Sequence, residues 1–288
     1  MPDTRDRETL LALPIHDVPF VLLDVESTGL DARAGDRICE IAFVRWQGGE
    51  VTGRFETLVD PGRSISAGAY AVNGIEDDAL MGAPSFADLA PRLLHELDGT
   101  VLVAHNVPFD VEFIDTELAR IGRPRLTNLA LDTLTLARAF LTHDRYSLQA
   151  LSRDLGFDRP AHRAMSDVLA LLSLFDHLLT RLRMLGVVTL ADLVRAQRGL
   201  LPGQPEPEAP PLIAEALRNG TRLRIAYRTG GADPVAREIL PLEFRTESGP
   251  PRLIAYCYLR NGQRTFYLDR ITEIAPGRSH SPEAGRSQ

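Results

Sequence analysis

The sequence contains no lysine, so all 32 of its basic residues are arginines. Lysine supplies the phosphate-binding side chain of a P-loop and the nucleophile of Schiff-base enzymes and ligases. Its absence therefore excludes nucleotide-triphosphate chemistry and covalent catalysis of those kinds.

Cysteine and long apolar segments are also scarce. The two cysteines, Cys39 and Cys257, are too far apart in the sequence to form a metal-binding or redox motif. No segment approaches the roughly 20 consecutive apolar residues of a membrane span. The first residues also lack the basic-then-apolar order of a secretory signal. We therefore expect a cytoplasmic protein with no membrane partner.

Acidic and basic residues are unevenly distributed along the 288-residue chain, whose net charge is −7. Residues 212–288 contain 12 arginines and 8 acidic residues, whereas residues 1–211 contain 20 arginines and 31 acidic residues. The C-terminal part could therefore contribute some affinity for phosphate groups. The acidic part includes the candidate metal ligands, whose charge bound cations would offset.

A proline-rich segment with two glutamates, residues 198–211, predicts an extended linker between two domains. Before it, apolar runs with the pattern of strands are followed by segments with helical periodicity. The predicted strands span residues 20–25, 37–46, 51–59 and 101–105, and the predicted helices 86–97, 111–121, 131–141, 148–154 and 164–185. This order predicts an α/β fold with a mixed sheet packed by helices.

After the linker the pattern becomes mainly that of strands. A short helical turn at 212–217 precedes four predicted strands, at 222–228, 236–244, 253–259 and 265–268. Asn261-Gly262 lies between the last two strands and predicts a hairpin. We expect a small β-rich domain over 212–276, followed by a disordered tail over 277–288.

Two acidic residues, Asp24 and Glu26, end the first predicted strand. Their spacing of two puts both side chains on one face of the strand. Keeping two adjacent carboxylates ionised costs electrostatic free energy unless a cation bridges them, so the pair favours a metal site. A polar strand end without function is the alternative.

A second motif follows the strand predicted at 101–105. It places Asn106, Phe109 and Asp110 at the start of a helix, where a helix N-terminus favours an anion. Helix capping is the alternative explanation for the polar residues. Phe109 is harder to explain as part of a cap, because an aromatic ring beside an active site can stack on a base.

A third motif contains His162, which precedes a long amphipathic helix, and Asp167, which lies within that helix. A solvated surface histidine is the alternative explanation for His162. Together the three motifs supply four acids and one histidine, the side chains that a metal-dependent phosphodiester hydrolase requires. Mg²⁺ and Mn²⁺ select carboxylate oxygens, and an imidazole can accept a proton from the attacking water.

The order and spacing of these motifs give residues 18–185 a resemblance to the DEDD exonuclease superfamily, in its histidine-bearing branch. The likeness is strongest to the proofreading exonuclease subunits of bacterial DNA polymerase III, and it extends to the loop at 70–86. The tyrosine-bearing branch would have tyrosine at position 163, where this chain has Arg163. The resemblance implies a ribonuclease H-like mixed sheet flanked by helices, within a domain spanning 18–197.

The same resemblance implies roles for individual residues. Two divalent cations, Mg²⁺ or Mn²⁺, would be held by Asp24, Glu26, Asp110 and Asp167, with His162 as the general base. The substrate would contact Thr28 and Leu30 on one side and Asn106 and Phe109 on the other. Asp132, by contrast, is better explained as a helix N-cap.

The C-terminal domain resembles a second family, the WYL domains, over segments 223–227, 237–242, 252–257 and 264–271. That family implies a small Sm-like β-barrel that binds nucleic acid or another ligand. The name-giving Trp-Tyr-Leu is Pro251-Arg252-Leu253 in this chain. Arg252, Arg264 and Arg270 could line a phosphate-binding groove, or they could simply be solvated on a strand face.

We therefore predict a metal-dependent 3′–5′ exonuclease that releases 5′-mononucleotides from single-stranded 3′ ends, with a WYL-like domain for nucleic-acid recruitment or ligand sensing. DNA is favoured over RNA as the partner, but an exoribonuclease remains an alternative, because no residue identified here reads a 2′-hydroxyl. A ligand-responsive regulator that binds nucleic acid without turnover is an alternative of another class. The sequence identifies no polymerase or repair partner.

Overall fold

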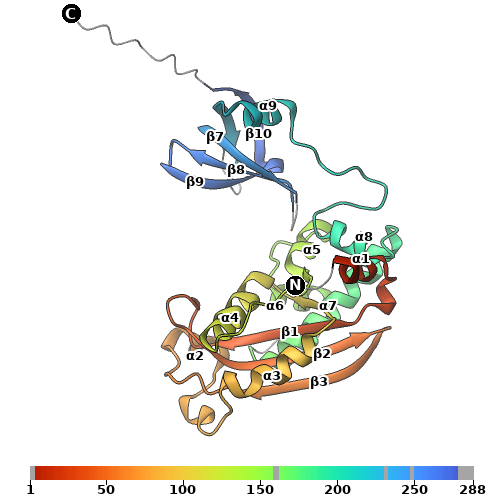
Figure 1. Cartoon of the computed structure of the whole chain (residues 1–288), viewed down its shortest axis with the longest axis vertical. Coiled ribbons are helices and arrows are strands. Elements are labelled where there is room, and N and C mark those ends of the chain that lie inside the picture. The colour runs from red at the N-terminus through yellow and green to blue at the C-terminus, as the bar shows by residue number, and fades with distance from the viewer. Residues whose placement is uncertain (1–3, 158–161, 230–232, 247–249, 278–288) are drawn as a thin grey trace, which may run out of the picture. The chain divides into compact units, whose positions relative to one another are not determined.

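The computed structural model describes residues 4–157, 162–229, 233–246 and 250–277 (Figure 1). The chain divides into two compact units, Met1–Pro202 and Gly203–Gln288. Each unit is built around a hydrophobic core of its own.

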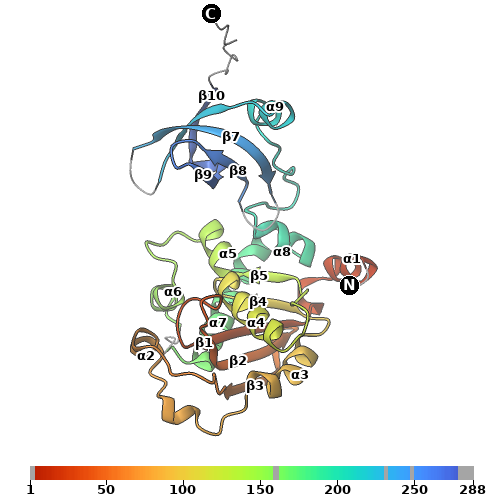
Figure 2. The ribbon, with the colours of Figure 1, turned by 60° about the vertical axis from the view of Figure 1, so that its left-hand side comes forward.

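The first unit contains a five-stranded mixed sheet in the order β3-β2-β1-β4-β5 (Figure 2). Its strands are β1 (Phe20–Ser27), β2 (Ile38–Gln47), β3 (Glu50–Leu58), β4 (Val101–Ala104) and β5 (Ala130–Asp132). The ladders β1–β2 and β2–β3 are antiparallel, whereas β1–β4 and β4–β5 are parallel. Because β1, β4 and β5 run in the same direction, their carboxyl ends meet at one edge of the sheet, the usual place for a ligand site in such folds.

Helices surround this sheet. They are α1 (Thr4–Ala12), α2 (Ala67–Asn73), α3 (Phe86–Leu97), α4 (Val107–Arg120), α5 (Thr133–Phe140), α6 (Leu148–Leu155), α7 (Ala164–Met184) and α8 (Leu190–Ala196). Several begin at a side chain that accepts a hydrogen bond from a backbone N–H of the first turn, which fixes where the helix starts. These N-cap residues are Ser66, Ser85, Asp132, Ser147 and Thr189.

Alternation along β1 divides the first unit into two cores. Phe20 and Leu22 face the core that includes α5 to α8, whereas Val21, Leu23 and Val25 face the core that includes α3 and α4. The central strand is therefore buried on both faces. Its two faces reach different layers of helices.

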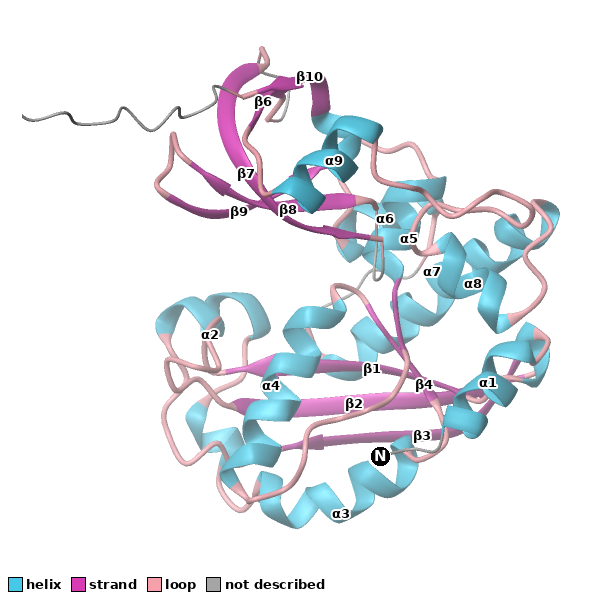
Figure 3. Cartoon of the chain, turned by 45° about the horizontal axis from the view of Figure 1, so that its top comes forward, coloured by secondary structure: helices cyan, strands magenta, loops and turns pink. Residues whose placement is uncertain are grey.

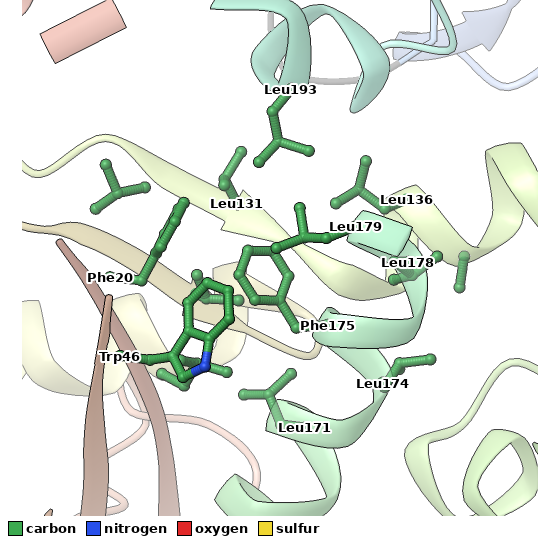
Figure 4. Packing of buried hydrophobic residues seen from close by; sticks show 14 of the residues in the cluster. Phe20, Trp46, Leu131, Leu136, Leu171, Leu174, Phe175, Leu178, Leu179 and Leu193 are labelled. Atoms are coloured by element: carbon green, nitrogen blue, oxygen red, sulfur yellow. The ribbon is translucent and has the colours of Figure 1, made fainter. Parts of the chain in front are cut away.

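The core on the α7 side is centred on three aromatic rings (Figure 4). The ring of Phe175 from α7 lies edge-on to Phe20 at 5.2 Å and to Trp46 at 5.9 Å between centroids. Such edge-to-face pairs add stabilisation to that of burial. This packing fixes α7 against β1 and β2, and with it the residues at the start of α7.

The exposed side of β5 is covered by a side chain from the end of α8. The Oε1 atom of Gln197 accepts a hydrogen bond from the backbone N–H of Asp132, and its Nε2 donates to the carbonyl of Ala130 at 3.5 Å. The amide of Gln197 therefore takes the place of a neighbouring strand over this short edge.

The second unit contains α9 (Pro211–Asn219) and an antiparallel sheet in the order β10-β6-β7-β8-β9 (Figure 3). Its strands are β6 (Leu223–Tyr227), β7 (Val235–Arg245), β8 (Arg252–Cys257), β9 (Gly262–Tyr267) and β10 (Ile271–Pro276), with a 3₁₀ turn η3 (Leu268–Arg270) between the last two. The register of the long strand β7 against β8 shifts between Pro241 and Glu243. Ile213 of α9 belongs to the same buried hydrophobic cluster as Ile225 and Phe266 of the sheet.

The predicted α/β class is confirmed for the first unit, and a small β-rich domain is confirmed for the second. The predicted hairpin at Asn261-Gly262 joins β8 to β9, with Asn261 at a φ of 48° and Cys257 paired with Gly262. The predicted helix at 131–141 is wrong at its start, because residues 130–132 form β5. Three residues with one buried apolar side chain, Leu131, carry too short a pattern to separate a strand from a helix.

Four further elements were not predicted: α1, α2, α8 and β10. The predicted disordered tail, 277–288, lies outside the described residues except for Gly277. Among the described residues, no helix combines the length and the apolar character that crossing a membrane requires.

Candidate functional site

Asp24 and Glu26 continue the face of β1 that carries Phe20 and Leu22. Where the strand reaches the edge of the sheet, the apolar side chains give way to these two acids, which are half-buried. Both carboxylates therefore point toward the α7 side of the sheet.

Asp110 reaches the same place from α4. This helix begins directly after β4, so its first turn lies at the carboxyl end of the strand beside β1. Asp110 is only 3% exposed, and its Oδ1 accepts a hydrogen bond from the backbone N–H of Val25 at 3.2 Å. That bond connects the second motif directly to the first.

Asp167 and His162 arrive on α7 and on the segment that leads into it. Asp167 is 5% exposed, and its Oδ1 accepts a hydrogen bond from the backbone N–H of His162 at 3.1 Å. His162 has a φ of 53°, an unusual conformation for a residue with a side chain. Nε2 of Gln149 lies 3.4 and 3.3 Å from the two ring nitrogens of His162, which limits the orientation of the imidazole.

The five residues line one cleft of about 630 Å³. Within it, Glu26, His162 and Asp167 each present a ligand atom within 4.8 Å of the others. The structure therefore brings together the candidate residues that the sequence distributes over three motifs. These are Asp24, Glu26, Asp110, His162 and Asp167.

Burial and mutual repulsion raise the pKa values of these acids. Burial, followed by the charges of Asp110 and Asp167, raises the pKa of Asp24 well above its ordinary value. Burial followed by the charge of Asp167 raises the pKa of Glu26 to about 7. Burial is also the main reason that the pKa of Asp110 is raised to about 8. Several carboxylates thus share a space in which they cannot all be ionised without a positive partner.

The donor set fits divalent cations. Carboxylate oxygens are the preferred ligands of Mg²⁺ and Mn²⁺, and the pKa values of three of the acids indicate a local excess of negative charge. Neither thiol lines the cleft, and Cys39 and Cys257 are both buried. Burial raises the pKa of Cys39 to about 12, so this thiol keeps its proton at neutral pH.

Three of the residues predicted to contact substrate line this cleft. Leu30 is 88% exposed, which is unusual for a leucine, and Asn106 and Phe109 lie on the α4 side. The ring of Phe109 packs against the ring of Phe113, with 4.8 Å between the centroids, and this contact holds Phe109 in place at the cleft. Val72 of α2, which no sequence motif indicated, adds an apolar side chain to the same cleft.

Thr28 is a correction to the predicted set. Its side chain is fully buried and does not line the cleft. Its hydroxyl donates to Asp36 at 3.3 Å and accepts from the backbone N–H of Arg37 at 3.1 Å. Thr28 therefore shapes the loop that presents Leu30. The close approach of Asp36 to the Cα of Gly29 leaves no room for a side chain at residue 29.

Asp132 behaves as the sequence predicts. Its Oδ1 accepts a hydrogen bond from the backbone N–H of Leu134, which caps α5, and a second from the backbone N–H of Asn106 at 3.0 Å. The second bond holds the αL conformation of Asn106 at the start of α4, with its φ of 80°.

An ion pair that no sequence motif indicated lies beside the candidate general base. Glu40 on β2 lies opposite Glu26 in the β1–β2 ladder and is 4% exposed. Nη2 of Arg163 donates to its Oε1 at 2.7 Å, and the backbone N–H of Ala164 donates to its Oε2 at 2.9 Å. Glu40 thus fixes the two residues that follow His162. The sequence contained one indication of this role, because Glu40 is an acidic residue within the otherwise apolar run of β2.

The three predicted arginines of the second unit do not share one face. Arg252 pairs with Tyr267, whereas Arg264 pairs with Ala255, three positions further along β8. Directly opposed residues share a face and successive residues alternate, so Arg252 and Arg264 project from opposite faces of the hairpin. The prediction that all three arginines line a single groove is therefore wrong.

Arg270 belongs to a separate small cavity. This cavity has a volume of about 180 Å³ and is lined by Arg228, Asp269, Arg270 and Thr272. The backbone N–H of Arg228 donates to the carbonyl of Arg270 at 2.9 Å, which holds the two arginines side by side.

Comparison with known proteins agrees with this arrangement. A family model described as Exonuclease matches residues 21–175, which include all five candidate residues. The chain belongs to this exonuclease family. A second model, described as WYL domain, matches residues 208–276, so the second unit carries a WYL domain.

Three curated relatives of this chain are bacterial proteins. A DNA polymerase III subunit epsilon-like protein of Rhodobacter capsulatus is 39% identical over 67% of this chain, but the match spans only 28% of that protein. The DNA polymerase III subunit epsilon of Treponema pallidum is 37% identical over 56% of this chain and 77% of its own length. The 3'-5' exonuclease DinG of Bacillus subtilis is 36% identical over 61% of this chain and 19% of its own length.

Solved structures share the fold. The E. coli exonuclease I in complex with a dA16 oligonucleotide has a TM-score of 0.57 at 18% identity, over 84% of this chain and 55% of that chain. A product-bound exonuclease I structure has a TM-score of 0.58 at 17% identity, over 90% of this chain and 65% of that one. At such identities the likeness concerns the fold.

The crowding of carboxylates predicts a stability effect. Asp24→Asn should raise the free energy of unfolding in EDTA by about 1 kcal/mol, because it removes one of the repelling charges. It should also abolish the thermal stabilisation that Mg²⁺ or Mn²⁺ gives the wild type. Thermal melts with EDTA and with each metal measure both effects, and Asp176→Asn on the exposed side of α7 is the control.

The same melts should depend on pH. In the folded chain without metal, Asp110 keeps its proton to about pH 8, whereas its ordinary pKa is 3.8. The folded state therefore binds more protons over this interval, and its stability should fall as the pH rises from about 4 to about 8. Two results would contradict the raised pKa values. One is a wild-type melting temperature in EDTA that rises between pH 4 and pH 8, and the other is a melting temperature that is lower in Asp24→Asn than in the wild type.

The Glu40–Arg163 pair predicts a specific loss of turnover. Glu40→Gln should lower kcat on a phosphodiester substrate by roughly 10- to 100-fold with little change in KM, because His162 loses its support. Glu117→Gln is the matched control, since Glu117 is 2% exposed and accepts from Nη2 of Arg37 at 2.8 Å. Equal losses of kcat in the two variants would show that Glu40 contributes only to stability.

Proposed function

We propose that this chain is a metal-dependent 3′–5′ exonuclease that hydrolyses phosphodiester bonds at single-stranded 3′ ends, with DNA preferred over RNA, and releases 5′-mononucleotides. The observation that carries the proposal is the convergence of Asp24, Glu26, Asp110, His162 and Asp167 on one cleft. The names of the relatives, a DNA polymerase III subunit epsilon and a 3'-5' exonuclease, support the direction of cleavage and DNA as substrate. The dA16 complex of the structural neighbour supports a single-stranded substrate.

The four acids would hold two divalent cations, Mg²⁺ or Mn²⁺. When bound, such a pair stabilises the attacking and departing oxygens of an in-line displacement at phosphorus. The acids themselves would fix the positions of these charges, since Asp110 is held by Val25 and Asp167 by the backbone of His162.

The imidazole of His162 would accept the proton of the attacking water at a ring nitrogen. Gln149 contacts the ring, and the Glu40–Arg163 pair holds the backbone beside it. The exposed side chain of Leu30 and the supported ring of Phe109 offer apolar surfaces on which the terminal base can pack.

We also propose that residues 18–197 form the catalytic domain and 212–276 an accessory domain, joined by the linker 198–211. The accessory domain would recruit nucleic acid or sense a ligand. Because the proposed substrate is nucleic acid, the cytoplasm is the compartment in which the protein would act.

The nuclease proposal is tested with 3′- and 5′-labelled single strands of DNA and RNA. With Mn²⁺ or Mg²⁺ the wild type should shorten DNA from the 3′ end and release 5′-mononucleotides, and EDTA should stop the reaction. Asp24→Ala should lower the rate by at least about 10³-fold, since it removes a metal ligand. Asp176→Asn should leave the rate unchanged.

The other outcomes separate the alternatives. Faster degradation of RNA would indicate an exoribonuclease. Binding of single strands without any metal-dependent product would indicate a regulator. An unchanged rate in Asp24→Ala would show that the proposed metal site is wrong.

The accessory role is tested in the full chain with Arg228→Gln combined with Arg270→Gln, the two arginines of the small cavity. If the WYL domain binds strands through this cavity, affinity for single-stranded DNA should fall, and the slope of log K against log salt should become shallower by about 1 to 2. Arg264→Gln, on a strand outside the cavity, is the control. Identical affinity and salt dependence in all three proteins would defeat nucleic-acid recruitment by this cavity.

A further inference from the structure

A second cleft adjoins the metal site on its other side. It has a volume of about 750 Å³ and shares Asp24, His105, Asn106 and Asp167 with the first cleft. Two of the candidate metal ligands, Asp24 and Asp167, therefore line both clefts, which form two arms of one site. We call the arm that contains Leu30, Val72 and Phe109 the terminal arm, and the arm that contains Arg138, Tyr146 and Gln149 the upstream arm.

The two arms differ in chemistry. The terminal arm presents more apolar than polar surface, because Leu30, Val72 and Phe109 line it, although the side chains of Asp31, Ser66 and Asn73 also reach it. The upstream arm presents more polar than apolar surface: it is lined by Arg138, Tyr146, Ser147, Gln149 and Asp144, with Leu134 and Leu148 beside them. Among the described residues that line either arm, Arg138 is the single arginine.

Arg138 is available to a ligand. Its side chain is exposed on α5, and it makes no ion pair with any other residue in the described part of the chain. A guanidinium that forms no ion pair within the described residues and lies in a polar cleft is suited to a phosphate, because its planar donors match the oxygens of the anion.

The wall that carries Arg138 is firmly held at the metal site. Asp132 caps α5 and also binds the backbone of Asn106. The ring of His105 lies between Oγ1 of Thr133 at 2.9 Å and the carbonyl of Tyr146 at 2.8 Å. The position of α5 relative to the carboxylates is thus fixed by several hydrogen bonds before any ligand binds.

Cleavage at a 3′ end divides the substrate into one terminal nucleotide and the remaining strand, with the reacting phosphate between them. An apolar arm suits the terminal nucleoside, whereas the remaining strand needs a polar arm with positive charge for its next phosphate. We propose that the upstream arm binds the strand 5′ of the scissile bond and that Arg138 contacts the first phosphate on that side. This assignment rests on the proposed function of the site.

The test compares two dinucleotides, TpT and pTpT, which differ only in a 5′-phosphate. Wild type should hydrolyse pTpT with a kcat/KM about tenfold above that for TpT, because only pTpT carries the phosphate that Arg138 would bind. In Arg138→Gln that ratio should fall to near one, with the rate on TpT unchanged. Arg181→Gln is the matched control, since Arg181 is exposed on α7 and lies about 21 Å along the helix from Asp167.

The assignment is wrong if the ratio of kcat/KM on pTpT to kcat/KM on TpT is unchanged in Arg138→Gln, or if it falls equally in Arg181→Gln. Failure of wild type to cleave either dinucleotide would instead overturn the proposed nuclease function. In that case binding of fluorescent dT8 in EDTA decides the role of Arg138. The assignment then requires that Arg138→Gln binds dT8 more weakly than Arg181→Gln, and that its slope of log K against log salt concentration is shallower by about one. Equal affinities of the two variants reject the assignment.

Discussion

Repulsion among carboxylates at the edge of the central sheet is the constraint around which the first unit is organised. Asp24, Glu26 and Asp110 are brought to a place where burial raises the pKa of each, so the folded chain is least stable there without a cation. Two backbone hydrogen bonds, from Val25 and from His162, hold the acids on α4 and α7 in spite of this repulsion. The hydrophobic cores on both faces of β1 supply the stability that lets the arrangement persist.

The central strand connects structure with chemistry. Its alternate residues pack on two different helix layers, and the face that packs on α7 ends in the two acids. A change of one residue in the register of β1 would exchange these faces and turn both acids into the wrong core. The same strand pairs with β2, whose Glu40 supports the segment after His162. One strand therefore sets the relative positions of metal ligands and candidate base.

Much of this arrangement could be predicted from the sequence because it depends on local patterns. The spacing of Asp24 and Glu26, the acid in the first helical turn at Asp110, and the amphipathic helix around Asp167 each follow from the period of one element. Contacts made only by the fold could not be predicted in that way. Glu40 and Arg163 are far apart in sequence, and β5 is defined by pairing with β4 rather than by its three residues. Thr28 was misplaced because a hydroxyl after an acid motif gives no sign of whether it faces a ligand or its own loop.

Gln197 has a consequence beyond the sheet that it covers. An open strand edge offers unpaired N–H and C=O groups to any other extended chain, and natural proteins protect such edges to avoid aggregation. By bonding to both Ala130 and Asp132, the amide of Gln197 occupies the free hydrogen-bonding groups of β5. Gln197 therefore prevents another extended polypeptide from pairing with this edge of the sheet. The edge lies beside Asn106, so the same side chain keeps the neighbourhood of the proposed substrate cleft free of strand-to-strand association.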